Sequence, residues 1–166
     1  MGKVAATLGS VSFLAVAPGV VAGWLPWSLT DGWTRNTVPH PDWLIAIGAL
    51  FVGAGTASLL GTFGLYVAQG RGTPAPIAPT EQLVVRGLNR YVRNPMYLAV
   101  VAMIVGQACI LAQPVLFAYA VAALAAMAAF ARWHEEPVLR ARYGTQYRAY
   151  CDRVPAWIPR RPDRAS

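Results

Sequence analysis

The segment WLIAIGALFVGAGTASLLGTFGLYVA, residues 43–68, decides the fold class of this sequence. It contains no charged residue and exceeds the roughly 20 apolar residues that a helix needs to cross a bilayer. The whole chain has 166 residues, one domain's worth, and is 56% hydrophobic and 13% charged. Soluble domains carry about 25% charged residues. The sequence therefore predicts an integral membrane protein.

Three further apolar stretches are candidate spans, at residues 4–25, 97–113 and 115–133. Pro114 stands between the last two with almost no loop around it, so we expect a tight helical hairpin there. The first stretch also has features of a signal peptide, but the proline that follows its AVA motif disfavours cleavage, and we expect it to be retained. The predicted fold class is all-α integral membrane, with four transmembrane helices in a single domain of residues 1–166.

Small residues recur at every fourth position of the second span, at Gly53, Ala57 and Gly61. Such spacing lets two helices approach closely, so these residues are expected to form a packing seam. The same seam would permit a homo-oligomer.

Charge placement predicts the orientation in the membrane. With four spans, every Lys and Arg except Arg35 would lie on one side, which the positive-inside rule makes cytoplasmic. Both termini would then be cytoplasmic, in a bacterial-type inner or plasma membrane. The net charge of +7 would attract anionic membrane lipids. Nucleic acid is not an expected partner, because the basic residues lie beside the membrane without a recognised binding motif.

The cysteines and histidines predict neither a disulfide nor a metal site. Cys109 falls in the third span and Cys151 in the tail, while His40 and His134 fall on opposite sides of the membrane. No metal is therefore expected as a partner.

The segment between the second and third spans, residues 70–96, is dense in glycine, proline and apolar residues. This composition predicts an ordered loop folded onto the membrane surface. Pro95 would start the third span, since a proline at the first helical position loses no hydrogen bond. Asn94 before it is a candidate N-cap, and the free amides of this helix start would suit a carboxylate.

Two adjacent acids, Glu135 and Glu136, follow the fourth span. Buried carboxylates at the end of a span need a paired cation. The alternative is a solvated helix start, at which the acids complement the helix dipole.

The tail after these acids predicts an amphipathic helix in the membrane interface over residues 135–150, because Leu139, Tyr143 and Tyr147 are spaced by four. Trp157 and its neighbour Ile158 would anchor the end of the tail among the lipid headgroups. Arg140 is expected to lie on the outer side of the tail, without a role in a site.

Two separated elements resemble a known family. GLNRYVRNPMY at residues 87–97 and EEPVLRARYGTQYRAYCDRVPAWIP at 135–159 resemble the isoprenylcysteine carboxyl methyltransferase family and its phospholipid methyltransferase relatives. The resemblance covers about residues 72–159. It implies an integral membrane enzyme that transfers a methyl group from S-adenosyl-L-methionine to a lipophilic acceptor, with the cofactor held by residues 72–97 and 132–159.

The resemblance also implies roles for single residues. One of the two acids would bind the ammonium group of the cofactor, Arg93 or the start of the third span its carboxylate, and Tyr91 and Tyr97 would lie near its adenosine. Arg132 is the cation available for an acidic acceptor, or else a residue that snorkels to the interface. The implied catalytic residues are Arg132 and Glu135. The implied cofactor-binding residues are Glu81, Gln82, Leu83, Val84, Asn89, Tyr91, Arg93, Asn94, Pro95, Met96, Tyr97, Glu135 and Glu136.

The chain departs from the family's pattern at three positions. Asn89 stands where many relatives have tyrosine, and Asn94 where the prenylcysteine enzymes have histidine. Those enzymes are also expected to hold the substrate carboxylate with an arginine just before the acidic pair, whereas this chain offers only Arg132, three residues before Glu135. The resemblance therefore implies the residues of the cofactor site more closely than those of the acceptor site. Two alternatives stay open: a phospholipid N-methyltransferase, and a non-enzymatic membrane scaffold whose charges line the interface.

Overall fold

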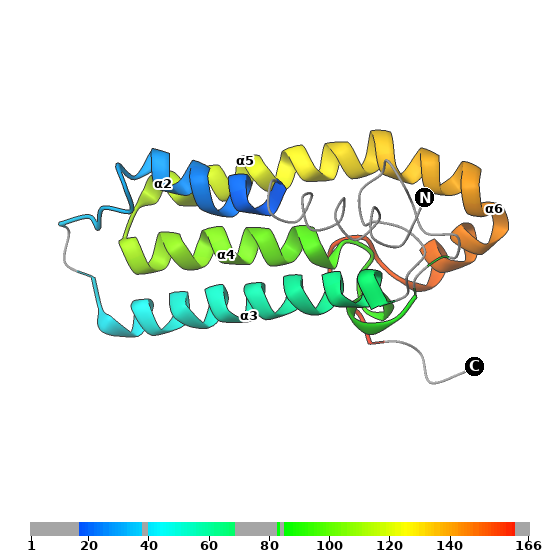
Figure 1. Ribbon diagram of the computed structural model, residues 1–166, viewed down its shortest axis with the longest axis horizontal. Helices are drawn as coiled ribbons and strands as arrows, with labels where there is room; N and C mark the ends of the chain where they lie inside the picture. The colour runs from blue at the N-terminus through cyan, green and yellow to red at the C-terminus, as the bar shows by residue number, and fades with distance from the viewer. Residues whose placement is uncertain (1–16, 38–39, 69–82, 84, 162–166) are drawn as a thin grey trace.

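The computed structural model describes residues 17–37, 40–68, 83 and 85–161, and the regular structure within these ranges is entirely helical. Helices α3, α4 and α5 lie side by side with α4 in the middle, and η1 and α2 run along α4 and α5 (Figure 1). The elements in chain order are η1 (Val20–Trp24), α2 (Leu25–Leu29), α3 (Asp42–Ala68), η2 (Gly87–Arg90), α4 (Pro95–Leu111), α5 (Pro114–Phe130), η3 (Ala131–Glu135) and α6 (Glu136–Arg153).

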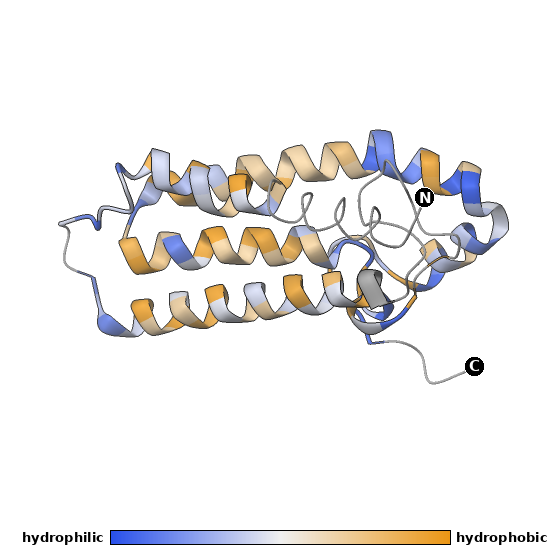
Figure 2. Cartoon of the chain, viewed as in Figure 1, coloured by the Kyte–Doolittle hydropathy of each residue, from blue (hydrophilic) through white to orange (hydrophobic). Residues whose placement is uncertain are grey.

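Two helices among the described residues are long and apolar enough to cross a membrane, Asp42–Leu65 and the continuous helix that begins at Pro114. The helix Pro95–Leu111 is also apolar but shorter. Figure 2 shows hydrophobic residues along α3, α4 and α5, and hydrophilic residues where η3 and α6 continue beyond them; we call this the polar end. The all-helical fold is confirmed. The four-span topology stays a prediction, and residues 4–16 of the first span lie outside the described residues.

The hairpin predicted around Pro114 is confirmed. Helix α4 ends at Leu111 and α5 begins at Pro114, and Ala112 between them adopts a left-handed conformation with φ of 52°. Both α4 and α5 begin with a proline, which fits the first helical position because its missing N–H has no partner there.

Helices α3 and α4 pack through glycines other than those predicted. A Cβ atom at Gly48 would lie 2.6 Å from the carbonyl oxygen of Gly106, so only glycines allow the backbones to approach this closely. In contrast, Gly53, Ala57 and Gly61 are exposed, and their predicted seam is not the one between α3 and α4. Small residues occur on several faces of α3, and the position of the facing glycine in α4 selects the face that packs.

Polar side chains of α4 and α5 hold the described end of the first span. Pro26 has no N–H to donate to the carbonyl of Ala22 four residues earlier, and the side-chain amide of Gln107 donates to this carbonyl instead, at 2.8 Å. In the π-helical turn η1, the N–H of Leu25 bonds to Val20, and the Val21 carbonyl accepts from the Tyr119 hydroxyl at 2.8 Å. These bonds matter because unpaired backbone groups are costly in a membrane.

Helix α6 differs from the predicted interfacial helix. It continues from α5 through η3 without a break, and turns back at Gly144, whose φ of 52° and ψ of −119° suit glycine (Figure 1). The stripe predicted to face lipid packs inside the protein instead: Tyr147 is buried, and Leu139 and Tyr143 pack against the same small core, together with Leu83. An apolar stripe fits a protein partner as well as a membrane, and here the turn at Gly144 supplies the protein partner.

Candidate functional site

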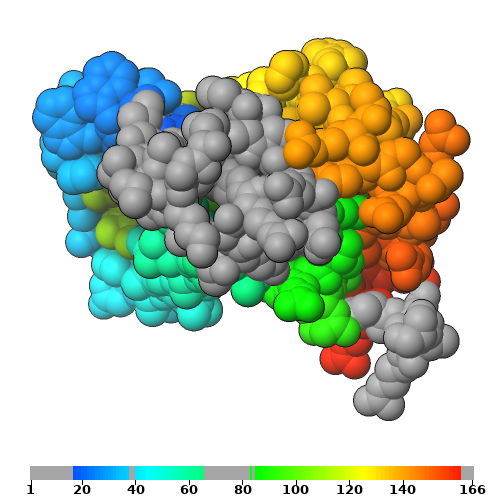
Figure 3. Space-filling view, turned by 45° about the vertical axis from the view of Figure 1, so that its right-hand side comes forward, coloured from blue at the N-terminus to red at the C-terminus, as the bar shows by residue number. Residues whose placement is uncertain are grey.

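The two sequence elements singled out above meet at the polar end. The residues after α6, 154–160, form a strap that crosses the turn before α4. Four hydrogen bonds join the segment 89–94 to α6 and the strap: Arg93 N to Pro155 O at 2.9 Å, Asn94 Nδ2 to Ala156 O at 3.2 Å, Arg160 N to Tyr91 O at 3.0 Å, and Tyr150 Oη to Asn89 O at 2.8 Å. In the space-filling view, α6 and the segment around η2 meet at this end of the molecule (Figure 3).

Asn94 occupies the N-cap position of α4 but does not cap it. Its side chain makes no capping hydrogen bond, and its amide nitrogen donates to Ala156 in the strap instead. The predicted capping role is therefore wrong, and the side chain of Asn94 ties the start of α4 to the strap instead.

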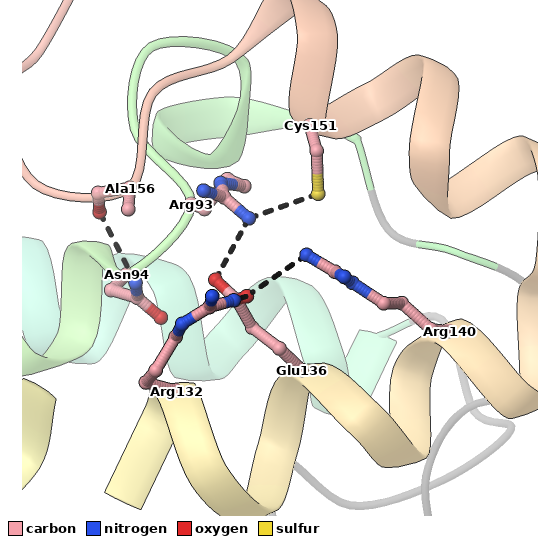
Figure 4. A network of polar contacts seen from close by, with 7 residues as sticks. All are labelled: Arg93, Asn94, Arg132, Glu136, Arg140, Cys151 and Ala156. Atoms are coloured by element: carbon pink, nitrogen blue, oxygen red, sulfur yellow. Dashed lines mark hydrogen bonds and ion pairs between the residues drawn. The ribbon is translucent and has the colours of Figure 1, made fainter. Parts of the chain in front are cut away.

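Glu136 is surrounded by three arginines (Figure 4). Its Oε1 accepts from Arg93 at 3.0 Å, and its Oε2 accepts from Arg132 at 3.1 Å and Arg140 at 3.3 Å. The Glu136 side chain is only 13% exposed, whereas those of Arg132 and Arg140 are 66% and 50% exposed. The alternative of a solvated helix start is thus excluded for Glu136, which is a paired carboxylate within a continuous helix.

Arg93 is the most buried of these arginines, with a side-chain exposure of 16%. Its Nη1 donates to Cys151 Sγ at 2.9 Å as well as to Glu136, and its buried Nε has no hydrogen-bond partner among the residues that the structure describes. Burial opposes the charged form, but the neighbouring Cys151 and Glu136 outweigh it and raise the pKa of Arg93. Arg93 is therefore a permanent cation beside the strap.

Glu135 has different surroundings although it adjoins Glu136. It ends the π-helical turn η3, and its Oε1 accepts a hydrogen bond of 2.7 Å from the Tyr97 hydroxyl. No arginine pairs with it in the described part of the chain. Burial raises the pKa of its carboxyl, while the bond from Tyr97 and the charge of His134 act in the opposite direction. Within the described ranges, Glu135 is thus a half-buried acid that no arginine neutralises.

A cleft of about 270 Å³ lies between these elements. Its volume is just under the roughly 300 Å³ at which small-molecule pockets begin. Its charged lining is dominated by the arginines around Glu136, and small residues of the α5–η3 helix form an apolar part of the wall. The lining residues are Arg93, Asn94, Ala128, Ala131, Arg132, Glu136, Arg140, Ala156 and Trp157.

The structure brings four of the predicted site residues together in this cleft and places two beside it. Arg93, Asn94, Arg132 and Glu136 line it, and the Tyr97–Glu135 pair adjoins it, because the Tyr97 ring stacks on the cleft residue Trp157 with centroids 6.3 Å apart.

Other predicted residues lie elsewhere. Asn89 and Pro95 are buried, Met96 packs into the core between the helices, Leu83 packs against α6, and Tyr91 is 40% exposed. None of these five lines the cleft. Glu81, Gln82 and Val84 lie outside the described residues.

Five of the lining residues were not predicted as site residues: the three alanines Ala128, Ala131 and Ala156, and the two larger side chains Arg140 and Trp157. The expectation that Arg140 lies apart from any site is wrong, and its spacing of four from Glu136 on one helix was a sequence signal for the pairing. Trp157 was expected among the lipid headgroups, but the strap turns it inward. Its neighbour Ile158, in contrast, is strongly exposed, at 79%.

The charged side chains in and beside the cleft suit a ligand that carries both a negatively and a positively charged group. Three guanidinium groups share one carboxylate, so the cleft carries excess positive charge and favours an anion. Glu135 beside it offers an acid to a cation. Among the described residues, no group of three or more His, Cys, Asp or Glu side chains is gathered in a way that would hold a metal ion.

Comparison with known families gives an independent result. A family model described as phospholipid methyltransferase matches residues 42–146, which include α3, α4, α5 and both acids. The strap and Trp157 lie outside the matched range. Searches of the curated proteins and of the solved structures found no match.

Proposed function

Because the chain belongs to the phospholipid methyltransferase family, whose members are integral membrane methyltransferases, we propose that it transfers a methyl group from S-adenosyl-L-methionine to a lipophilic acceptor at the cytoplasmic face of the membrane. The observation that carries this proposal is the meeting of residues 93–97 with Glu135 and Glu136 around one cleft. The two elements come from distant parts of the chain, and a scaffold without a ligand would not require them to meet.

The residues present fit the methionine end of this cofactor. Its carboxylate suits the excess of guanidinium groups in the cleft, where three arginines surround one glutamate. Its ammonium group suits Glu135. Glu136 is the poorer candidate for the ammonium, because three arginines already neutralise it.

The protein's contribution to the reaction would be positioning and exclusion of water. When bound, the cofactor would supply an electrophilic methyl group on a sulfonium, which the acceptor's nucleophile would attack so that the electron pair of the broken carbon–sulfur bond stays on sulfur. Arg93 and Asn94, both tied to the strap, would hold the cofactor in one orientation. Arg132, the most exposed of the three arginines, would hold an acidic group of the acceptor. The strap would keep water from the sulfonium.

Binding of the cofactor is the first test. Isothermal titration of the detergent-purified protein with S-adenosyl-L-methionine and with S-adenosylhomocysteine should give saturable binding of both. If neither binds at millimolar concentration, the enzyme proposal fails and the membrane scaffold is favoured.

The description of the family favours a second candidate, a phospholipid N-methyltransferase. Mass spectrometry of a membrane lipid extract incubated with isotopically labelled cofactor separates the two candidates. Label on ethanolamine headgroups would identify the N-methyltransferase, and label on another lipophilic acid, amine or alcohol would identify a different acceptor.

A further inference from the structure

Trp157 is the aromatic residue that lines the cleft, and neither the sequence resemblance nor the matched family model assigns it a role. It lies outside the matched range 42–146, on the strap, and lines the same cleft as the three arginines. Its ring stacks on Tyr97 with an angle of 20° between the planes, and Tyr97 in turn donates to Glu135. Trp157 thus connects the cleft, whose charged lining is Glu136 and its three arginines, to Glu135, an acid beside the cleft that no arginine pairs with among the described residues.

The position of Trp157 is fixed on both sides along the chain. Before it, the carbonyls of Pro155 and Ala156 accept hydrogen bonds from the backbone of Arg93 and the side chain of Asn94. After it, the N–H of Arg160 donates to the segment before α4. A residue that only anchored the tail in lipid would not need three such bonds around it. A binding residue does, because its ring must be held in place before the ligand arrives.

The charge pattern indicates what the ring would recognise. The face of an indole ring carries partial negative charge and attracts a cation more strongly than any other aromatic side chain does. A sulfonium is a cation without an N–H or O–H donor, and an aromatic face is one of the groups that stabilise such a cation. In the cofactor, three carbon atoms separate the sulfonium from the ammonium group assigned to Glu135. Tyr97 connects the two groups in the protein, because its hydroxyl donates to Glu135 and its ring stacks on Trp157.

We propose that Trp157 recognises the sulfonium cation of the methyl donor and thereby favours the donor over its neutral thioether product. This inference rests on the proposed function and names the residue that discriminates between the two states of the cofactor. After transfer the sulfur is neutral, the attraction to the ring is lost, and the product is released more easily.

The test compares the affinities of two ligands in the full-length, detergent-purified protein. Isothermal titration gives the dissociation constants of S-adenosyl-L-methionine and S-adenosylhomocysteine for the wild type, Trp157→Leu and Trp157→Phe. The control is Ile158→Ala, which changes the exposed neighbour on the same strap. The donor-to-product affinity ratio should fall about 3- to 30-fold in Trp157→Leu, the range that cation–π energies imply. It should fall less in Trp157→Phe, which keeps an aromatic face, and stay unchanged in Ile158→Ala.

Several results would overturn the inference. Equal weakening of both ligands would mean that Trp157 stacks on the adenine or only supports the fold, and no weakening would mean that it does not contact the cofactor. If Trp157→Leu does not fold, an unchanged ratio in Trp157→Phe contradicts the proposal. Failure of both ligands to bind the wild type would be a failure of the proposed function, which this design distinguishes from a failure of the role of Trp157.

Discussion

The two adjacent acids should respond differently to the same substitution. Replacing Glu136 by glutamine removes the charge shared by three arginines, of which Arg93 is largely buried. Hydrogen bonds to charged groups contribute about 1.5–3 kcal/mol each. The pairs with Arg132 and Arg140 add little because both arginines are largely exposed. We therefore expect Glu136→Gln to lower the free energy of unfolding by about 1.5–3 kcal/mol, essentially the contribution of the Arg93 pair.

Glu135→Gln should leave the free energy of unfolding unchanged and weaken the binding of the cofactor. Burial raises the pKa of Glu135, so its ionised form is less favourable in the folded than in the unfolded state, and losing the charge should not destabilise the fold. Glutamine can still accept the hydrogen bond from Tyr97. Loss of the carboxylate should weaken binding of the cofactor's ammonium group by about 1.5–3 kcal/mol, or roughly 10- to 150-fold.

Thermal unfolding followed by intrinsic fluorescence, together with titration calorimetry, separates these effects. For a chain of this size, a loss of about 1 kcal/mol in the free energy of unfolding lowers the unfolding temperature by about 2–4 °C. Glu136→Gln should therefore lower the unfolding temperature by about 3–12 °C. Glu135→Gln should unfold at the wild-type temperature. The assignment of the two acids would be refuted if Glu135→Gln lost stability instead, or if it bound the cofactor as tightly as the wild type.

Three further predictions concern pH and helix packing. Cofactor affinity should fall as the pH is lowered through the raised pKa of Glu135, thus at a higher pH than about 4.3 for an ordinary glutamate, and calorimetry of Glu135→Gln should show no such step. Gly106→Ala should strongly lower the unfolding temperature, because its Cβ atom would lie 2.6 Å from a backbone carbonyl of α3. Gly53→Ala should not, because a Cβ atom there would meet no described side chain or neighbouring helix within 4 Å. Gln107→Leu should destabilise the protein by about 0.6–2 kcal/mol, since the carbonyl of Ala22 loses its donor, and an unchanged unfolding temperature would contradict this role.

The helices were predictable because hydropathy is a local property of the chain. The predicted span 43–68 differs from α3 by one residue, and the hairpin at Pro114 follows from a proline between two apolar runs. Which face of each helix packs against its neighbour was not predictable. Small residues lie on several faces of α3, and only the position of Gly106 on α4 decides that Gly48, and not Gly53, lies in the contact.

The site was predictable in part, through the resemblance of two separated elements to a known family. This resemblance pointed to Arg93, Asn94 and the two acids, which the fold brings together. It did not distinguish Glu135 from Glu136, because their different surroundings depend on how the π-helical turn rotates neighbouring side chains. Trp157 was missed because its inward direction is set by the strap, whose hydrogen bonds join residues about sixty positions apart.

A structure of the protein bound to S-adenosylhomocysteine tests the central claim most directly. We expect the ligand in the cleft between α4, η3 and the strap, with its ammonium group hydrogen-bonded to Glu135 and its carboxylate on the arginines around Glu136. A ligand bound elsewhere, with Tyr97 and Glu135 still paired only to each other, would contradict the proposed site.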